Sequence, residues 1–101
     1  MKNKPTLFHP GLRQVTTPGA MRALERSGES PDNFLTRHLS GDWGELCAED
    51  RTVNTQALID GSQVMSVYSL RDRTKIWIIT DGVIQHDGAR QATTILLPDE
   101  Y

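Results

Sequence analysis

Two segments in the last third of the chain are rich in β-branched and aromatic residues, and they constrain the fold more than any other feature. The first runs from Thr74 to Thr80 (TKIWIIT) and the second from Thr93 to Pro98 (TTILLP). Turn-forming residues separate them, which is typical of paired strands in one buried sheet. Successive residues of 63–70 alternate between the two faces expected of a strand, and the polar turn 71–74 joins this segment to the first one. We therefore expect a hairpin and one further strand.

Short helices are expected before these strands. Residues 17–28 and 30–41 each begin with threonine or serine followed by proline, and each segment ends at a glycine. A longer helix is expected over 42–61, because Asp42-Trp-Gly-Glu45 has the spacing of a capping box. Residues 12–16 indicate a short first strand. The sequence thus predicts an α+β fold, with three short N-terminal helices packed on one face of a small antiparallel sheet of three to four strands.

Length and composition indicate a single small domain in the cytoplasm. The 101 residues suffice for one core, which we assign to residues 11–101, after a flexible tail over 1–10. A net charge of −2 argues against a general nucleic-acid coat protein. No apolar run approaches the roughly 20 residues that cross a bilayer, so we expect no membrane association. Signal-peptide features are absent and Cys47 has no internal disulfide partner, which favours the cytosol.

Two polar residues interrupt the apolar stripe of the expected third helix. Asp50 and Asn54 fall in the middle of that stripe, where polar groups need hydrogen-bond partners. One interpretation is that they fix a neighbouring loop or strand start. The other is a polar pocket between helices and sheet, with Asp50 as a base or orienting group. The apolar members of the stripe are Trp43, Leu46, Cys47, Val53, Ala57 and Leu58.

Catalytic candidates are few. His38 could act as a general acid or base near neutral pH, or it could simply cap its helix. Arg71, Arg73 and Lys75 cluster at the expected hairpin, where they form either a solvated turn or a grip on phosphate. One cysteine and three scattered histidines give no metal motif, and no phosphate-binding glycine loop follows a strand. We expect neither a metal nor a cofactor.

The order of several short motifs resembles a family of small uncharacterised bacterial proteins that are often encoded on plasmids and mobile elements. The resemblance extends from about residue 12 to the C-terminus, and it implies a bacterial cytosolic setting without implying an activity. The motifs are Thr17-Pro-Gly-Ala20, Arg37-His38, Gly41-Asp-Trp-Gly44, Glu49-Asp50, Asn54, Lys75-Ile-Trp-Ile-Ile-Thr80, Thr93-Thr-Ile-Leu-Leu-Pro98 and Glu100-Tyr101.

Three functions remain open from the sequence. The leading hypothesis is a non-enzymatic accessory module that binds an unknown protein partner through a strand edge or the region around Trp43, with Asp50 and Asn54 as further binding candidates. The alternative is a small metal-independent ribonuclease or toxin-like nuclease, with His38 and Asp50 beside the basic hairpin. It requires His38 and the hairpin to share a cleft. A DNA-binding regulator is disfavoured, because its recognition helix would begin with acidic residues.

Overall fold

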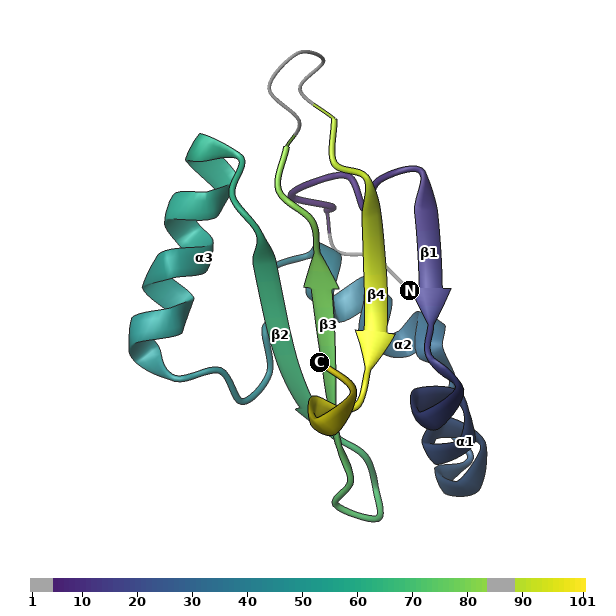
Figure 1. The fold of residues 1–101 in the computed structure, drawn as a ribbon. Helices are drawn as coiled ribbons and strands as arrows, with labels where there is room; N and C mark the ends of the chain where they lie inside the picture. The colour runs from purple at the N-terminus through teal and green to yellow at the C-terminus, as the bar shows by residue number, and fades with distance from the viewer. Residues whose placement is uncertain (1–4, 84–88) are drawn as a thin grey trace.

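The computed structural model describes residues 5–83 and 89–101, so His86 lies outside the described residues. These described residues form four strands, three α-helices and a closing 3₁₀-helix, and Figure 1 labels the strands and α-helices. In chain order they are β1 (Arg13–Thr16), α1 (Pro18–Ser27), α2 (Pro31–Leu39), α3 (Ala48–Asp60), β2 (Val64–Ser69), β3 (Lys75–Thr80), β4 (Ala92–Leu96) and η1 (Pro98–Glu100).

The strands form one mixed sheet in the order β1-β4-β3-β2. The expected hairpin is present as β2 and β3, and β4 pairs antiparallel with β3. The prediction of an antiparallel sheet is wrong for β1, which runs parallel to β4. A parallel pair needs a long crossover rather than a tight turn, and here the crossover contains all three helices and the hairpin. The α+β class and the four strands are confirmed.

The main core lies between the sheet and the helices α1 and α2. In Figure 1, α2 lies behind the sheet and α1 follows the lower end of β1. Alternate residues of each strand point toward these helices, since side chains alternate along a strand. The buried members of this core are Ala20, Ala23, Leu24, Phe34, Tyr68, Leu70, Ile76, Ile78 and Ile95. Both helices begin as predicted, because the Thr17 hydroxyl accepts from the Ala20 amide and the Ser30 hydroxyl from the Asp32 amide.

The third helix differs from the prediction in its start. It begins at Ala48, and residues 42–47 form a loop. The carboxylate of Asp42 accepts from the amide of Gly44, two residues on, and pairs with Arg37. These contacts form a local turn instead of a capping box, since aspartate bonds readily to its own nearby backbone. Glu45 pairs with Lys75 rather than capping the helix.

The position of α3 also differs from the prediction. It lies beside β2 at one edge of the sheet, not on the face that α1 and α2 cover (Figure 1). A second apolar cluster, made of Trp43, Leu46, Ala57 and Val64, holds it there. The inward positions predicted for Cys47 and Val53 are wrong, because the thiol residue is exposed and Val53 is 59% exposed. The later helix start changes which residues form its inner face.

The residues expected to form a loose N-terminal tail make contacts with the domain from Leu7 onward. The Leu7 amide donates to the carbonyl of Leu39 at 2.7 Å. The Phe8 ring meets the His38 ring edge-on, with 5.2 Å between their centroids. These contacts place residues 7–10 over the end of α2 and close the buried polar network described below.

Candidate functional site

His38 stands at the centre of a fully buried chain of hydroxyl groups. Its Nδ1 lies 2.6 Å from Ser66 Oγ, and its Nε2 lies 2.8 Å from Thr80 Oγ1. Thr80 Oγ1 is 2.7 Å from Thr93 Oγ1, and the Thr93 hydroxyl donates to the carbonyl of Pro10. That carbonyl can only accept, so the protons are ordered along the chain. Thr80 donates to Thr93, His38 donates from Nε2, and Ser66 donates to Nδ1.

This environment keeps His38 neutral. Burial, with the nearby positive charge of Arg90 as a second cause, lowers its pKa from 6.5 to about 3. The ring and the three hydroxyl groups are inaccessible to solvent. A general acid or base must reach a substrate proton, and His38 has no such access in this arrangement. The network instead joins β2, β3, β4 and the segment before β1.

The structure does not bring together the residues that a nuclease would use. His38 bonds to Ser66 and Thr80, at the end of the β2–β3 ladder opposite the 70–74 turn. At that turn, Arg71 lies 4.0 Å from Glu29, and Lys75 pairs with Glu45. Asp50 is exposed on the first turn of α3, where it accepts from the Cys47 thiol. Neither of the two hollows described below is lined by any of these groups.

The predicted binding residues have three different environments. Trp43 is 7% exposed and belongs to the second apolar cluster, so it is not a surface anchor. Asp50 is exposed. Asn54 is buried, and its side chain pairs with the backbone of Met65 in both directions: the amide donates to the Met65 carbonyl at 2.7 Å and the oxygen accepts from the Met65 N–H at 3.1 Å. Asn54 thus acts like one residue of a neighbouring strand.

The outer edge of β2 is covered along much of its length. Asn54 satisfies Met65, and the loop before α3 satisfies Val67, which donates to the Trp43 carbonyl and accepts from the Glu45 amide. Gly44 between them makes a bridge to Val67. An uncovered strand edge is a template for pairing with another chain, and this cover removes that template.

The opposite edge, formed by β1, is open. The amides of Arg13 and Thr17 donate toward β4, to Gln91 and Ile95. Because the backbone groups of a strand alternate in direction, the N–H and C=O groups of Gln14 and Thr16 point away from the sheet. Within residues 5–83 and 89–101 these outward groups have no backbone hydrogen-bond partner. The strand contains no proline or lysine; it is four residues long, and Arg13 is its one charged residue.

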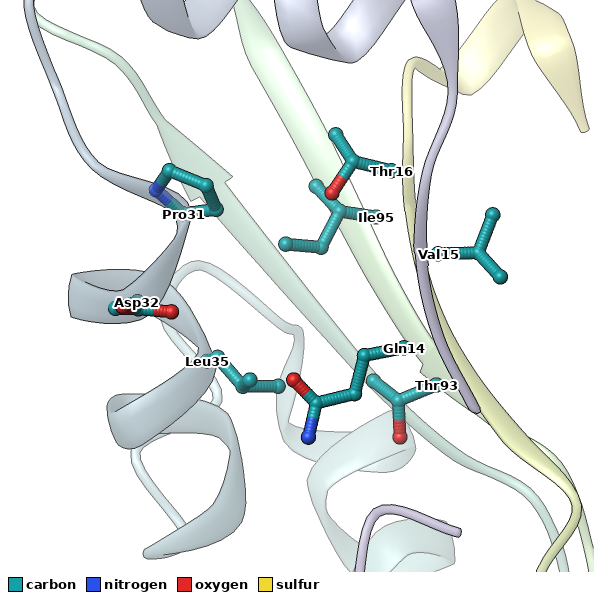
Figure 2. A pocket seen from close by; sticks show the side chains of 8 residues that line it. All are labelled: Gln14, Val15, Thr16, Pro31, Asp32, Leu35, Thr93 and Ile95. Carbon is teal, nitrogen blue, oxygen red and sulfur yellow. The ribbon is translucent and has the colours of Figure 1, made fainter. Parts of the chain in front are cut away.

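A hollow of about 170 Å³ lies between this edge and α2 (Figure 2). Its floor is apolar and comes from Leu35 and Ile95, and Pro31 closes one end. Gln14 and Thr16 project into it from β1, whereas the side chain of Val15, which also borders the hollow, points to the other side of the strand (Figure 2). Asp32 faces it from the first turn of α2. An extended segment paired with β1 would therefore place alternate side chains over this hollow.

A second hollow, of about 260 Å³, lies on the front face of the sheet. Ile79, Leu96 and Tyr101 line it together with polar residues of the strand ends. The Tyr101 ring approaches Trp77 with 5.6 Å between centroids. It lies over strands that are already paired on both sides, so it offers side-chain contacts without free backbone groups.

The comparisons and the remaining searches add no further site. Comparison of the chain with protein-family models, with curated proteins and with solved structures gives no match. In the part of the chain that the structure describes, no group of three or more His, Cys, Asp and Glu side chains is placed to hold a metal ion. None of the described helices is long and apolar enough to span a membrane. The open edge and its hollow are therefore the best candidate site.

No sequence motif marks the residues of this site. Gln14 and Thr16 lie in a segment with weak alternation, and Asp32 and Leu35 belong to a short helix. Their proximity depends on the parallel pairing of β1 with β4 and on the packing of α2. The one local signal was the five-residue alternation before Thr17-Pro18, which marks a strand too short to be central.

Proposed function

We propose that the protein is a protein-binding module that accepts an extended segment of a partner along the free edge of β1. The observation that supports it most is the unpaired outward backbone of Gln14 and Thr16 beside a hollow that α2 completes. Main-chain hydrogen bonds to a sheet edge provide affinity, and pockets for alternate side chains provide specificity. The sheet has both features at this edge.

The other edge supports the same proposal by contrast. Two separate devices, the Asn54 side chain and the loop 43–45, satisfy the backbone of β2. A sheet that needed protection at both ends would be expected to carry a similar device on β1. The selective exposure of one edge favours a role in pairing.

The test uses a displayed library of random nine-residue segments, selected against the full chain. Affinities of the selected segments are then measured for two variants, Thr16→Pro and Thr16→Val. Proline removes the outward N–H of residue 16 and is tolerated at strand edges, whereas valine keeps that N–H and the β-branched shape. Loss of one hydrogen bond of about 1.4 kcal/mol corresponds to a tenfold weaker affinity.

We expect Thr16→Pro to weaken binding about tenfold or more and Thr16→Val to change it by less than about threefold, on the same free-energy scale. Thermal melting of both variants verifies that the fold is retained. Equal affinities for the two variants would contradict pairing at β1. A library that yields no binder to the wild-type chain would contradict the proposal as well.

A further inference from the structure

The hollow beside β1 combines an apolar floor with a polar rim. Leu35 and Ile95 form the floor, and Ile95 is 4% exposed. Gln14, Thr16 and Asp32 form the rim, and their side chains point toward the hollow in Figure 2. A hollow of about 170 Å³ has room for one long side chain.

The rim carries one negative charge that the described residues leave unpaired. The ion pairs of the described residues join Arg26 to Asp72, Arg37 to Asp42, Arg71 to Glu29 and Lys75 to Glu45. Asp32 takes part in none of them. Among residues 5–83 and 89–101, no arginine, lysine or histidine lines the hollow. A cation on an incoming segment would therefore meet this carboxylate without displacing a partner from the described part of the chain.

We infer that the extended segment bound at β1 carries a lysine or arginine whose side chain occupies this hollow; the inference rests on the proposed function above. The alkyl stem would lie along Leu35 and Ile95, and the charged head would meet the Asp32 carboxylate at the rim. Lysine and arginine commonly bury an apolar stem while their charged end stays at the surface. The apolar floor and the single anionic rim group match the two halves of such a side chain.

A second copy of the chain fits the hollow less well. Two β1 strands can pair edge to edge only through the outward backbone groups of Gln14 and Thr16, because those of Arg13 and Val15 face β4. In a closed two-fold dimer the two β1 strands pair antiparallel, and the even-numbered residues of the incoming copy then lie on the side of the hollow, as they do in the first copy. The one cation of β1, Arg13, would point to the opposite face and leave Asp32 unpaired.

The experiment repeats the library selection in parallel on the full wild-type chain, on Asp32→Asn and on Glu49→Gln. Glu49 is a matched control, because it is an exposed acid in the first turn of α3, as Asp32 is in the first turn of α2. We expect lysine or arginine to be enriched at one position of the segments selected by the wild-type chain and by Glu49→Gln. On Asp32→Asn, the affinity of these segments should fall three- to tenfold.

Three outcomes would overturn the inference, and they separate it from the proposed function. The selected segments could lose affinity on Thr16→Pro and yet show no preference for a basic residue, or they could show the same preference when selected on Asp32→Asn. Either result would support strand addition at β1 and refute the inference that a lysine or arginine occupies the hollow. Segments insensitive to Thr16→Pro would refute both. Analytical ultracentrifugation tests whether the free chain forms a concentration-dependent dimer. A dimer that Thr16→Pro abolishes would show that a second copy pairs with β1, and it would refute the inference of a basic partner segment.

Discussion

The two edges of the sheet follow opposite designs. At β2, the buried Asn54 side chain and the loop around Gly44 satisfy the outward backbone of Met65 and Val67. At β1, the outward groups of residues 14 and 16 have no backbone partner among the described residues. Both edges belong to the same four-stranded sheet. The difference between them is the basis for the proposal that one edge is protected against pairing and the other is available for it.

The protected edge depends on close backbone contact, and this makes Gly44 the most sensitive position. Gly44 has φ of +68°, and a Cβ built there would collide with the Val67 carbonyl and the Tyr68 ring. Gly44→Ala must therefore displace the loop from β2. We expect a loss of about 3 kcal/mol of unfolding free energy, from roughly 1 kcal/mol of backbone strain and two lost hydrogen bonds of roughly 1 kcal/mol each.

Gly28 provides the matched control for this substitution. It has φ of +70°, almost the same as Gly44, but nothing lies within 4 Å of its built Cβ. Gly28→Ala should thus cost only the strain, about 1 kcal/mol. Urea denaturation of both variants gives the two values. Equal losses would mean that the loop does not hold the β2 edge, and the contrast between the edges would fail.

The buried network around His38 links β2, β3 and β4 to the segment before β1, and its effect should appear in the pH dependence of stability. The pKa of His38 is about 3 in the folded chain and 6.5 in the unfolded chain. Between these two pH values the unfolded chain therefore binds a proton that the folded chain does not. The stabilisation is complete above pH 6.5 and falls as the pH drops toward 3, by at most about 1.4 kcal/mol per pH unit.

The measurement is the unfolding free energy of wild type, His38→Gln and His9→Gln between pH 6.5 and 4.5. Wild type and His9→Gln should lose stability by nearly the full slope for one proton. His38→Gln should lose less over this range, since its amide has no proton to take up. Parallel curves for all three proteins would show that His38 is not held neutral by the fold.

Much of the fold was predictable because its signals are local. The threonine-proline and serine-proline starts fixed two helices, and the alternation of 63–70 and 74–80 identified the hairpin. The start of α3 was not predictable from the sequence, because the tertiary contacts of residues 43–45 with Val67 outweigh the helix-start pattern of Asp42 and Glu45. The alternation pattern likewise contained no information on the parallel direction of β1.

The candidate site was less predictable than the fold for the same physical reason. Asp32 and Gln14 lie 18 positions apart in the numbered sequence, and no spacing rule joins a helix start to a preceding edge strand. The polar interruption at Asn54 was visible in the sequence, yet its hydrogen bonds to Met65 show that it closes an edge. The polar residue Asn54 in an apolar stripe indicated that some backbone group needed a partner. The open edge at β1 has no corresponding signal in the sequence.

The smallest expected effect on stability comes from a lysine at the open edge. Gln14→Lys would place a lysine side chain of the protein itself in the hollow beside Asp32. Because residue 14 is exposed, the unfolding free energy should change by less than about 0.5 kcal/mol. The new side chain would occupy the space that we assign to the partner's cation. Affinity for selected basic segments should fall about tenfold, equivalent to about 1.4 kcal/mol. Isothermal titration calorimetry measures this change.

Val15→Lys is the control that isolates the hollow from a general charge effect. It adds the same charge to the same strand, but Val15 points to the other side of β1 (Figure 2). Any repulsion of basic segments by an edge lysine would act in both variants, whereas competition for Asp32 acts only in Gln14→Lys. If the two variants bind equally, the charge of the edge and not the hollow determines specificity. If only Gln14→Lys weakens binding, the open edge selects its partner through the space between β1 and α2.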